Sequence, residues 1–213
     1  PPMNYELRTY TTKPGQAMVH VNNSGSLGRE IRGDDYGKLV GHWVTEIGPL
    51  NQSMHMWEYN DLNERAEKRA ALAKLDRWQN EYRPANGGVI IRQDIRLMNA
   101  VIGPKAPESG GNVYEFRNYR LKTGAIGKWC ALFTAAMEHR EKYSKIVGLW
   151  QTEAGQPNEV CHIWAYKDLA TRMEARAGAV ADPGWQAFLK EGGPLIEEMW
   201  STLMLPAAHS PLG

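Results

Sequence analysis

Hydrophobic and polar positions predict the same order of secondary structure in each half of the chain. In the first half, alternating or largely apolar runs predict strands at residues 4–12, 38–47, 53–60 and 88–98. Helices are expected at residues 15–34 and after Asp61, which is a good N-cap residue. The resulting order, β-α-β-β-α-β, is that of the ferredoxin-like unit.

The two halves are related by a tandem repeat. The segment YELRTY at 5–10 matches YEFRNY at 114–119, with an offset of 109 residues. The segment HMWEYNDL at 55–62 matches HIWAYKDL at 162–169, with an offset of 107. Because the order and spacing of the matches are kept along the chain, we expect both halves to have the same fold.

Two linked repeats predict a closed barrel. We expect the repeats at residues 1–104 and 112–213, with the linker GPKAPESGG between them. Each would form an antiparallel sheet with helices on one face, and the other face needs a cover. Two repeats in one chain can bury these faces against each other. The sequence therefore predicts an α+β fold in which an intramolecular pair of repeats closes a barrel.

Composition and charge argue against several classes of protein. The net charge is +1 and no basic stripe is present, so we expect no nucleic-acid partner. No apolar run approaches the roughly 18 residues of a membrane span, and no leader pattern opens the sequence. We therefore expect a cytoplasmic protein without a membrane partner. Eight Trp and nine Tyr against three Phe favour a pocket or an interface, since Trp and Tyr join an apolar ring to a polar group.

The repeated segments resemble the NIPSNAP family. The resemblance rests on YELRTYTTKPG, LVGHWVTEIGPLNQSMHMWEYNDLNERAEKRA and the helices that carry Trp78 and Trp185, with looser copies in the second half. It implies the dimeric α+β barrel superfamily, here fused into one chain. That superfamily includes cofactor-free monooxygenases, lactone isomerases, haem-handling enzymes and stress-response proteins. The resemblance implies a fold and leaves activity open, with a cofactor-free monooxygenase or an isomerase as the candidate enzyme classes.

Three side chains of the first aromatic strand are candidates for chemistry. His55, Trp57 and Tyr59 are two residues apart, so they share a face of a strand. An imidazole can move a proton near neutral pH, a phenol can donate to an oxyanion, and an indole can stack on a ligand. The alternative is that this row ties the hairpin to the neighbouring helix. The second repeat keeps the same three residues, and one active site rarely needs two identical rows.

Arg8 and Trp43 are further binding candidates, each with a structural alternative. Arg8 is suited to hold an anion, but Glu6 shares its face of the strand and predicts a buried ion pair. Trp43 follows Gly41 by two residues, which favours packing of the indole over bare backbone.

The repeats differ most in their first helix. In the second repeat this helix carries an apolar stripe that includes Trp129 and Phe133. An offset of 109 puts His20 and Ser24 at those positions of the first repeat, which predicts a ligand pocket between this helix and its sheet. The alternative is a partly unwound surface loop, since the first repeat is two residues longer here and rich in Gly and Asn. The expected lining is His20, Ser24, His42, His55, Trp57 or Tyr59.

These features lead to one expected function and one alternative. No HExxH, CxxC, GxGxxG or GxSxG motif is present and the six His are scattered, so we expect no metal site and no cofactor, although a single axial His to haem needs no spacing. We expect the first repeat to bind or transform a small apolar or aromatic molecule by proton-transfer, isomerisation or oxygenation chemistry. A non-catalytic interaction or scaffold protein is the alternative, and exposed helix faces favour a homo-oligomer. The catalytic candidates are His20, His55 and Tyr59, and the binding candidates are Ser24, His42, Trp43, Trp57 and Arg8.

Overall fold

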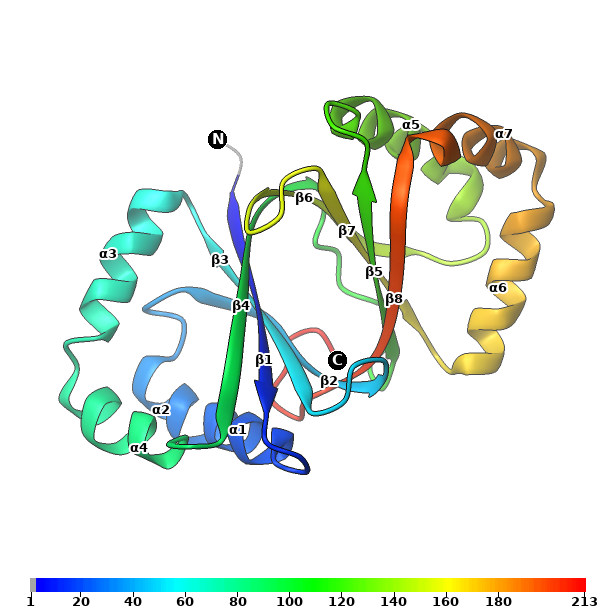
Figure 1. Ribbon diagram of the computed structural model, residues 1–213. Coiled ribbons are helices and arrows are strands. Elements are labelled where there is room, and N and C mark those ends of the chain that lie inside the picture. The colour runs from blue at the N-terminus through cyan, green and yellow to red at the C-terminus, as the bar shows by residue number, and fades with distance from the viewer. Residues whose placement is uncertain (1–2) are drawn as a thin grey trace.

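Eight strands close into one barrel, with a layer of helices on each side (Figure 1). The computed structural model describes residues 3–213. The order around the barrel is β1-β3-β2-β8-β5-β7-β6-β4, and neighbouring strands are antiparallel. The fused α+β barrel predicted from the repeat is therefore confirmed.

Each repeat contributes four strands and one helical layer. The first repeat contains β1 (Asn4–Thr12), α1 (Ala17–Asn23), the π-helical segment η1 (Ser24–Gly28), α2 (Arg29–Arg32), β2 (Lys38–Ile47), β3 (Gln52–Tyr59), α3 (Leu62–Leu72), the π-helical segment η2 (Trp78–Tyr82), α4 (Arg83–Ala85) and β4 (Ile90–Ile102). The second contains β5 (Val113–Leu121), α5 (Ile126–Arg140), β6 (Ile146–Ala154), β7 (Glu159–Tyr166), α6 (Leu169–Ala181), α7 (Pro183–Gly192), the 3-10 helix η3 (Gly193–Leu195) and β8 (Ile196–Pro206). Among residues 3–213, no helix has the length and apolar character needed to cross a membrane.

The helix that follows the hairpin of each repeat, α3 or α6, begins at an aspartate. The Asp61 carboxylate accepts a hydrogen bond from the Glu64 backbone N–H at 2.8 Å, and Asp168 accepts one from Thr171 at 2.7 Å. Each bond satisfies one of the backbone donors that a helix leaves free at its first turn. The expected N-cap at Asp61 is confirmed, and it fixes where the chain leaves β3.

The two sheets join edge to edge, so each repeat completes the other. β2 pairs with β8, and β4 pairs with β6. β4 is longer than the expected strand at 88–98, and its last residues continue along β6 as far as the pairing of Ile102 with Leu149. The barrel therefore has no free sheet edge where the repeats meet.

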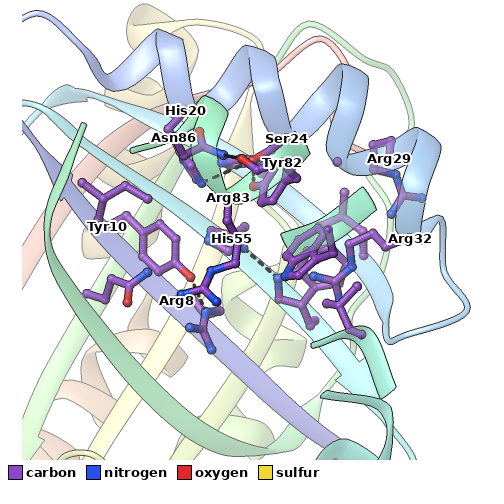
Figure 2. Close-up of a pocket in the computed structure, with 18 of the residues that line it drawn as sticks. Arg8, Tyr10, His20, Ser24, Arg29, Arg32, His55, Tyr82, Arg83 and Asn86 are labelled. Carbon is purple, nitrogen blue, oxygen red and sulfur yellow. Dashed lines mark hydrogen bonds between the residues drawn. The ribbon is translucent and has the colours of Figure 1, made fainter. Parts of the chain in front are cut away.

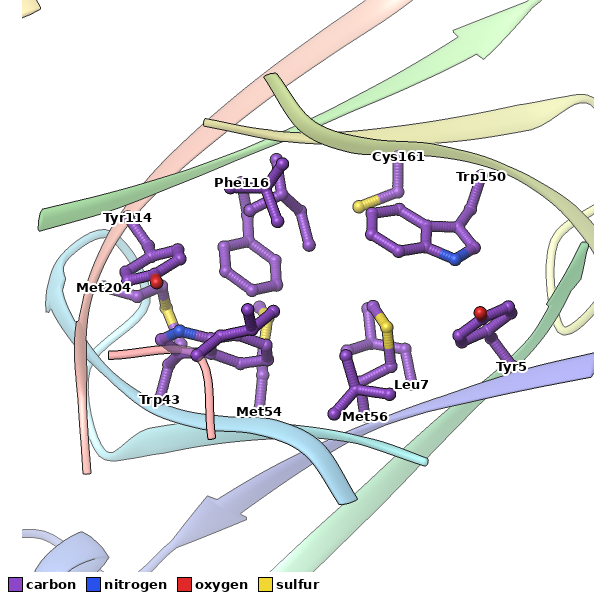
Figure 3. Packing of buried hydrophobic residues seen from close by; sticks show 14 of the residues in the cluster. Tyr5, Leu7, Trp43, Met54, Met56, Tyr114, Phe116, Trp150, Cys161 and Met204 are labelled. Carbon is purple, nitrogen blue, oxygen red and sulfur yellow. The ribbon is translucent and has the colours of Figure 1, made fainter. Parts of the chain in front are cut away.

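Alternate strand residues fill the barrel interior (Figure 3). Trp43 is fully buried there, with its ring centroid 4.9 Å from that of Phe116. A Cβ atom at Gly41 would lie 2.2 Å from the Trp43 ring, so glycine is what lets the indole cross the backbone. Gly148 and Trp150 repeat the arrangement, with 2.5 Å at the same point. The predicted packing of Trp43 over bare backbone is confirmed.

The first helix of the first repeat is continuous from Ala17 to Arg32 and is not an unwound loop. Its π-helical turn, η1, takes up one extra residue. Before this turn His20 has the place of Trp129, with an offset of 109. After it Arg32 has the place of Arg140, with an offset of 108, because each guanidinium lies over the strand tryptophan of its own repeat. The loop alternative is wrong: an insertion within the helix accounts for one of the two extra residues.

Candidate functional site

A pocket of about 410 Å³ lies in the first repeat, between its helices and the outer face of its sheet (Figure 2). One wall comes from all four strands of the repeat, β1, β2, β3 and β4. The other comes from the first helix, α3, η2 and α4, and both π-helical segments contribute to it. His209, from the segment after β8, completes the lining. The volume lies in the range of about 300–1,000 Å³ that is usual for small-molecule sites.

A hydrogen bond from Trp57 fixes the tautomer of His55, which lies on the pocket wall formed by the strands. The Trp57 indole N–H donates to Nδ1 of His55 at 2.7 Å. In the neutral imidazole the ring proton therefore lies on Nε2, which is buried and has no hydrogen-bond partner within residues 3–213. Burial, followed by the neighbouring basic side chains, holds the pKa of His55 well below its ordinary value. His55 is thus a neutral hydrogen-bond donor on the pocket wall.

A hydrogen-bonded chain links the two helical walls. Ser24 Oγ lies 3.3 Å from Nε2 of His20 and 2.8 Å from the Tyr82 hydroxyl. Gly28 lets the helices approach this closely, because a Cβ there would lie 2.9 Å from the Tyr82 ring. Burial, together with the smaller effect of His209, lowers the pKa of His20 to about 4. His20 is therefore neutral at pH 7, and its other nitrogen, Nδ1, is buried without a partner among the described residues.

Four histidines gather at one end of the pocket. The His42 ring centroid lies 5.0 Å from those of His55 and His209 and 5.8 Å from that of His20. Nδ1 of His42 lies 3.0 Å from Nε2 of His209, so this nitrogen is already engaged. Burial, then His20 and His209, holds the pKa of His42 well below its ordinary value. Within residues 3–213, no group of three or more His, Cys, Asp or Glu is placed to bind a metal ion.

The second repeat fills the equivalent space with apolar side chains. Trp129 and Phe133 stack with ring centroids 4.8 Å apart, and Phe188 packs edge-on against Phe133 at 5.7 Å. Strand register confirms the correspondence, because His42 lies opposite His55 just as Leu149 lies opposite the second-repeat histidine. The first repeat replaces each filling side chain with a smaller or polar one: His20 for Trp129, Ser24 for Phe133, His42 for Leu149 and Tyr82 for Phe188.

Six of the eight predicted site residues line this pocket. They are Arg8, His20, Ser24, His42, His55 and Trp57. Their place in the lining does not by itself assign them a role. Tyr59 and Trp43 do not belong to the lining, and both assignments need correction.

Tyr59 shares the face of His55 and Trp57, as expected, but it lies beyond the end of the pocket. It is 2% exposed and packs with Leu39 and Trp57. Trp43 is the direct neighbour of His42 on β2, and adjacent strand residues point to opposite faces. His42 and Trp43 are both binding candidates in the sequence, whereas in the structure only His42 faces the pocket and Trp43 fills the barrel.

Arg8 lines the pocket and is also held in the buried ion pair that the sequence predicted. Its Nη1 donates to Glu6 at 2.9 Å and its Nε to the Tyr10 hydroxyl at 2.7 Å. Arg65 also donates to Glu6, and Arg69 lies 3.6 Å from it. Burial alone would raise the pKa of Glu6, but the arginines outweigh it and hold this pKa below its ordinary value.

Several pocket residues were missed by the sequence argument. Arg32 follows η1 and Tyr82 is the last residue of η2, so each can be found from the repeat only when a one-residue shift is allowed. His209 gave no sequence signal, because it reaches the pocket from the other repeat. Gly25 makes room for it, since a Cβ there would lie 2.4 Å from its ring.

The fold defines the class of protein, a dimeric α+β barrel in which one chain supplies both halves. The NIPSNAP family matches residues 5–102 and 114–211, and the chain belongs to this family.

Protein NipSnap homolog 1 of Danio rerio is 30% identical over 212 residues, which cover 98% of this chain and 76% of the relative. Protein NipSnap homolog 2 of Homo sapiens is 32% identical over 220 residues, which cover 98% of this chain and 74% of the relative. A solved structure of a proposed monooxygenase from Lactobacillus acidophilus NCFM superposes with a TM-score of 0.71. It covers 98% of this chain and 95% of its own at 10% identity, which shows a common fold.

Proposed function

We propose that the first-repeat pocket binds a small, largely aromatic molecule and that His55 donates a hydrogen bond from Nε2 to an oxygen of it. One observation carries the proposal. Where the second repeat packs rings and aliphatic side chains to make a solid core, the first repeat keeps a cavity lined by polar groups. Burying unpaired polar groups is costly, by about 1–3 kcal/mol each. A ligand that pairs with them offsets this cost.

The chemistry that suits the site is proton transfer. A neutral donor such as His55 stabilises negative charge that develops on a carbonyl oxygen. His20 lies in the same pocket, and the chain from Ser24 to Tyr82 can supply or accept a proton at its Nε2. Its pKa of about 4 makes His20 a weak base, and negative charge developing beside it raises that pKa. Loss of a proton beside a carbonyl is the first step of either an isomerisation or a cofactor-free oxygenation.

The hydrogen bonds of the pocket histidines limit which of their nitrogen atoms could bind a haem iron. His55 keeps its proton on Nε2 because Nδ1 accepts from Trp57, so Nε2 has no lone pair for iron. Among the other pocket histidines, Nδ1 of His20 and Nε2 of His42 are buried and have no hydrogen-bond partner among residues 3–213. An absorbance spectrum of the purified protein in the Soret region tests haem directly.

A matched pair of variants tests small-molecule binding. Ser24→Phe places in the pocket the ring that the second repeat has, and Met18→Phe adds the same ring at an exposed position of α1. Aromatic fragments, both neutral and charged, would be screened by NMR against the wild type and both variants. We expect binding that Ser24→Phe abolishes and Met18→Phe leaves unchanged. Fragments that bind Ser24→Phe as well as the wild type would contradict the proposal.

A second candidate function is contact with another protein, including a second copy of this chain. Leu169, Met173 and Val180 are exposed and lie on one face of α6. Sedimentation equilibrium of the wild type and of Met173→Glu would test it. A dimer that the glutamate disrupts supports this function, and a monomer at all concentrations excludes self-association through this face.

A further inference from the structure

The charged side chains that line the first-repeat pocket all carry one sign. Five arginines contribute to the wall, and no Asp or Glu among the described residues does. The four histidines add further basic groups. The five arginines are Arg8, Arg29, Arg32, Arg69 and Arg83.

Three of these arginines contact a carboxylate behind the wall. Glu6 pairs with Arg8 at 2.9 Å and lies 3.6 Å from Arg69. Arg29 pairs with Asp34 at 2.9 Å. Glu6 is shared with Arg65 as well, so these contacts occupy the guanidinium groups and leave net positive charge at that part of the wall.

Arg32 and Arg83 have no such partner among residues 3–213. Arg32 is 7% exposed, lies 3.7 Å from the Trp57 ring centroid and donates to the backbone carbonyl of Tyr36 at 2.8 Å. Its Nε is buried and unpaired. Arg83 donates to the side-chain oxygen of Gln79 at 2.7 Å, and that group is neutral. Arg32 and Arg83 are therefore the two pocket arginines that contact no carboxylate of the described chain.

The second repeat shows what the same position looks like without a ligand. Arg140 lies over Trp164 at 4.2 Å, as Arg32 lies over Trp57. It donates to Ser144 at 2.7 Å and to the Tyr166 hydroxyl at 3.1 Å, and none of its nitrogens is left buried and unpaired. A buried arginine is tolerated there because its donors are used. In the first repeat a donor of the equivalent arginine is left free beside a cavity.

We propose that the ligand of the first-repeat pocket is a small organic anion with a planar unsaturated body, held through its charged group by Arg32 and Arg83. This inference rests on the proposed small-molecule function and narrows its ligand class. A guanidinium matches a carboxylate or a phosphate with two parallel donors. Trp57, Trp78, Tyr10 and Tyr82 give the pocket aromatic walls, which suit a flat body. The carboxylate and the phosphate ester share this chemistry, and the experiment separates them.

Calorimetric titration of charged and neutral isosteres tests the charge. The probes are 2-naphthoate against 2-naphthamide, with phenyl phosphate and inorganic phosphate as the phosphate pair, at pH 7.5. We expect 2-naphthoate or phenyl phosphate to bind at least about tenfold more tightly than 2-naphthamide, because a hydrogen bond to a charged group is stronger than a neutral one. The tighter of the two anions identifies the preferred group. Inorganic phosphate that binds as tightly as phenyl phosphate would overturn the planar body.

Substitutions of Arg32 and Arg83 test whether these two residues bind the charged group of the ligand. Arg83→Leu is at an exposed position, so folding is not at risk, and it should weaken the preferred anion about tenfold while leaving 2-naphthamide unchanged. Arg32→Gln should weaken it at least as much. The matched control is Arg140→Gln, which removes the same stacked arginine from the second repeat and should leave anion binding unchanged.

The failure of this inference is distinct from failure of the proposed function. If neither 2-naphthoate nor phenyl phosphate binds more tightly than 2-naphthamide, and Ser24→Phe abolishes the binding of 2-naphthamide, the anion is overturned and a neutral ligand remains for the pocket. Anion binding that neither Arg32→Gln nor Arg83→Leu weakens would overturn the assignment. Binding of every probe that Ser24→Phe does not affect would overturn both the inference and the proposed function.

Discussion

Trp57 donates its indole N–H to Nδ1 of His55 across 2.7 Å, from two residues further along the same strand face. Trp164 and His162 form the same bond at the same distance in the second repeat. There His162 packs against Phe133, with ring centroids 5.0 Å apart, and its Nε2 is buried without a hydrogen-bond partner among residues 3–213. The bond is a structural feature of both repeats, and the space beside it decides whether the histidine can meet a ligand.

Trp57→Phe is expected to release the tautomer of His55. The wild type should show Nε2-protonated, neutral His55 and His162 in proton–nitrogen NMR spectra. Without the indole donor, His55 should become a mixture of tautomers while His162 stays unchanged. The lost hydrogen bond and packing should lower the free energy of unfolding by about 1–3 kcal/mol. Trp164→Phe is the matched control and should affect His162 alone. An Nδ1-protonated His55 in the wild type would contradict the assignment.

Lowering the pH from 6.5 to 5 is expected to destabilise the protein. His20, His42, His55 and His162 are buried, and burial lowers their pKa values. In this range the unfolded chain takes up protons that the folded chain does not bind. Stability is therefore full above about pH 6.5 and falls toward the folded pKa values, which for His20 is about 4. The loss is at most about 1.4 kcal/mol per pH unit for each histidine.

Urea unfolding at pH 7, 6 and 5 measures this dependence. The window lies above the range in which the ion-paired carboxylates Glu6 and Glu115 become protonated, since their pKa values are lowered. His42→Leu should make the profile less steep. A free energy of unfolding that does not change between pH 7 and 5 would contradict the buried neutral state of the histidines.

His42 and Leu149 occupy equivalent positions, and exchanging their side chains should change the free energy of unfolding differently in the two repeats. His42→Leu introduces the second-repeat residue into the first repeat, and it removes a buried imidazole with an unpaired Nε2. We expect the free energy of unfolding to stay equal or to rise by about 1 kcal/mol, with loss of ligand binding. Leu149→His buries an imidazole in a packed core and should cost about 2–4 kcal/mol. Thermal and urea unfolding measure both, and destabilisation of equal size in the two variants would contradict the asymmetry.

Gly41→Ala should be strongly destabilising although it adds only one methyl group. The new Cβ would lie 2.2 Å from the Trp43 ring, and this tryptophan is fully buried in the barrel. We expect a loss of about 2–3 kcal/mol, at the upper end of what overpacking costs. Gly127→Ala is the control, because a Cβ there meets nothing within 4 Å and alanine favours a helix. Urea unfolding should show Gly127→Ala to be neutral or slightly more stable.

The fold could be predicted from the sequence because the two repeats independently indicate the same order of elements. Strand alternation gave the element order, and the kept spacing showed that two copies must meet. The pocket was located by subtraction, since Trp129 and Phe133 have His20 and Ser24 as counterparts. That step worked because side-chain volume is conserved in a packed core and its loss leaves space.

The rest could not be read from the sequence, for two physical reasons. A fixed offset cannot follow a π-helical insertion, so Arg32, which follows η1, and Tyr82, the last residue of η2, were not found. Contacts between elements far apart in the chain have no local pattern, so His209 gave no signal. Trp43 was misplaced because the two faces of β2 were not separated, and Tyr59 because a shared strand face does not define where a cavity ends.

The linkage of both halves in one polypeptide has a consequence for how such a pocket can arise. In a barrel built from two identical subunits, one substitution that opens space under a helix opens it twice. Here the same substitution changes one side only, and Trp129, Phe133 and Phe188 keep the other side solid. One repeat can then lose stability where a binding site forms, while the packed core of the other repeat keeps the barrel stable. The two repeats can differ in this way because one chain encodes them separately.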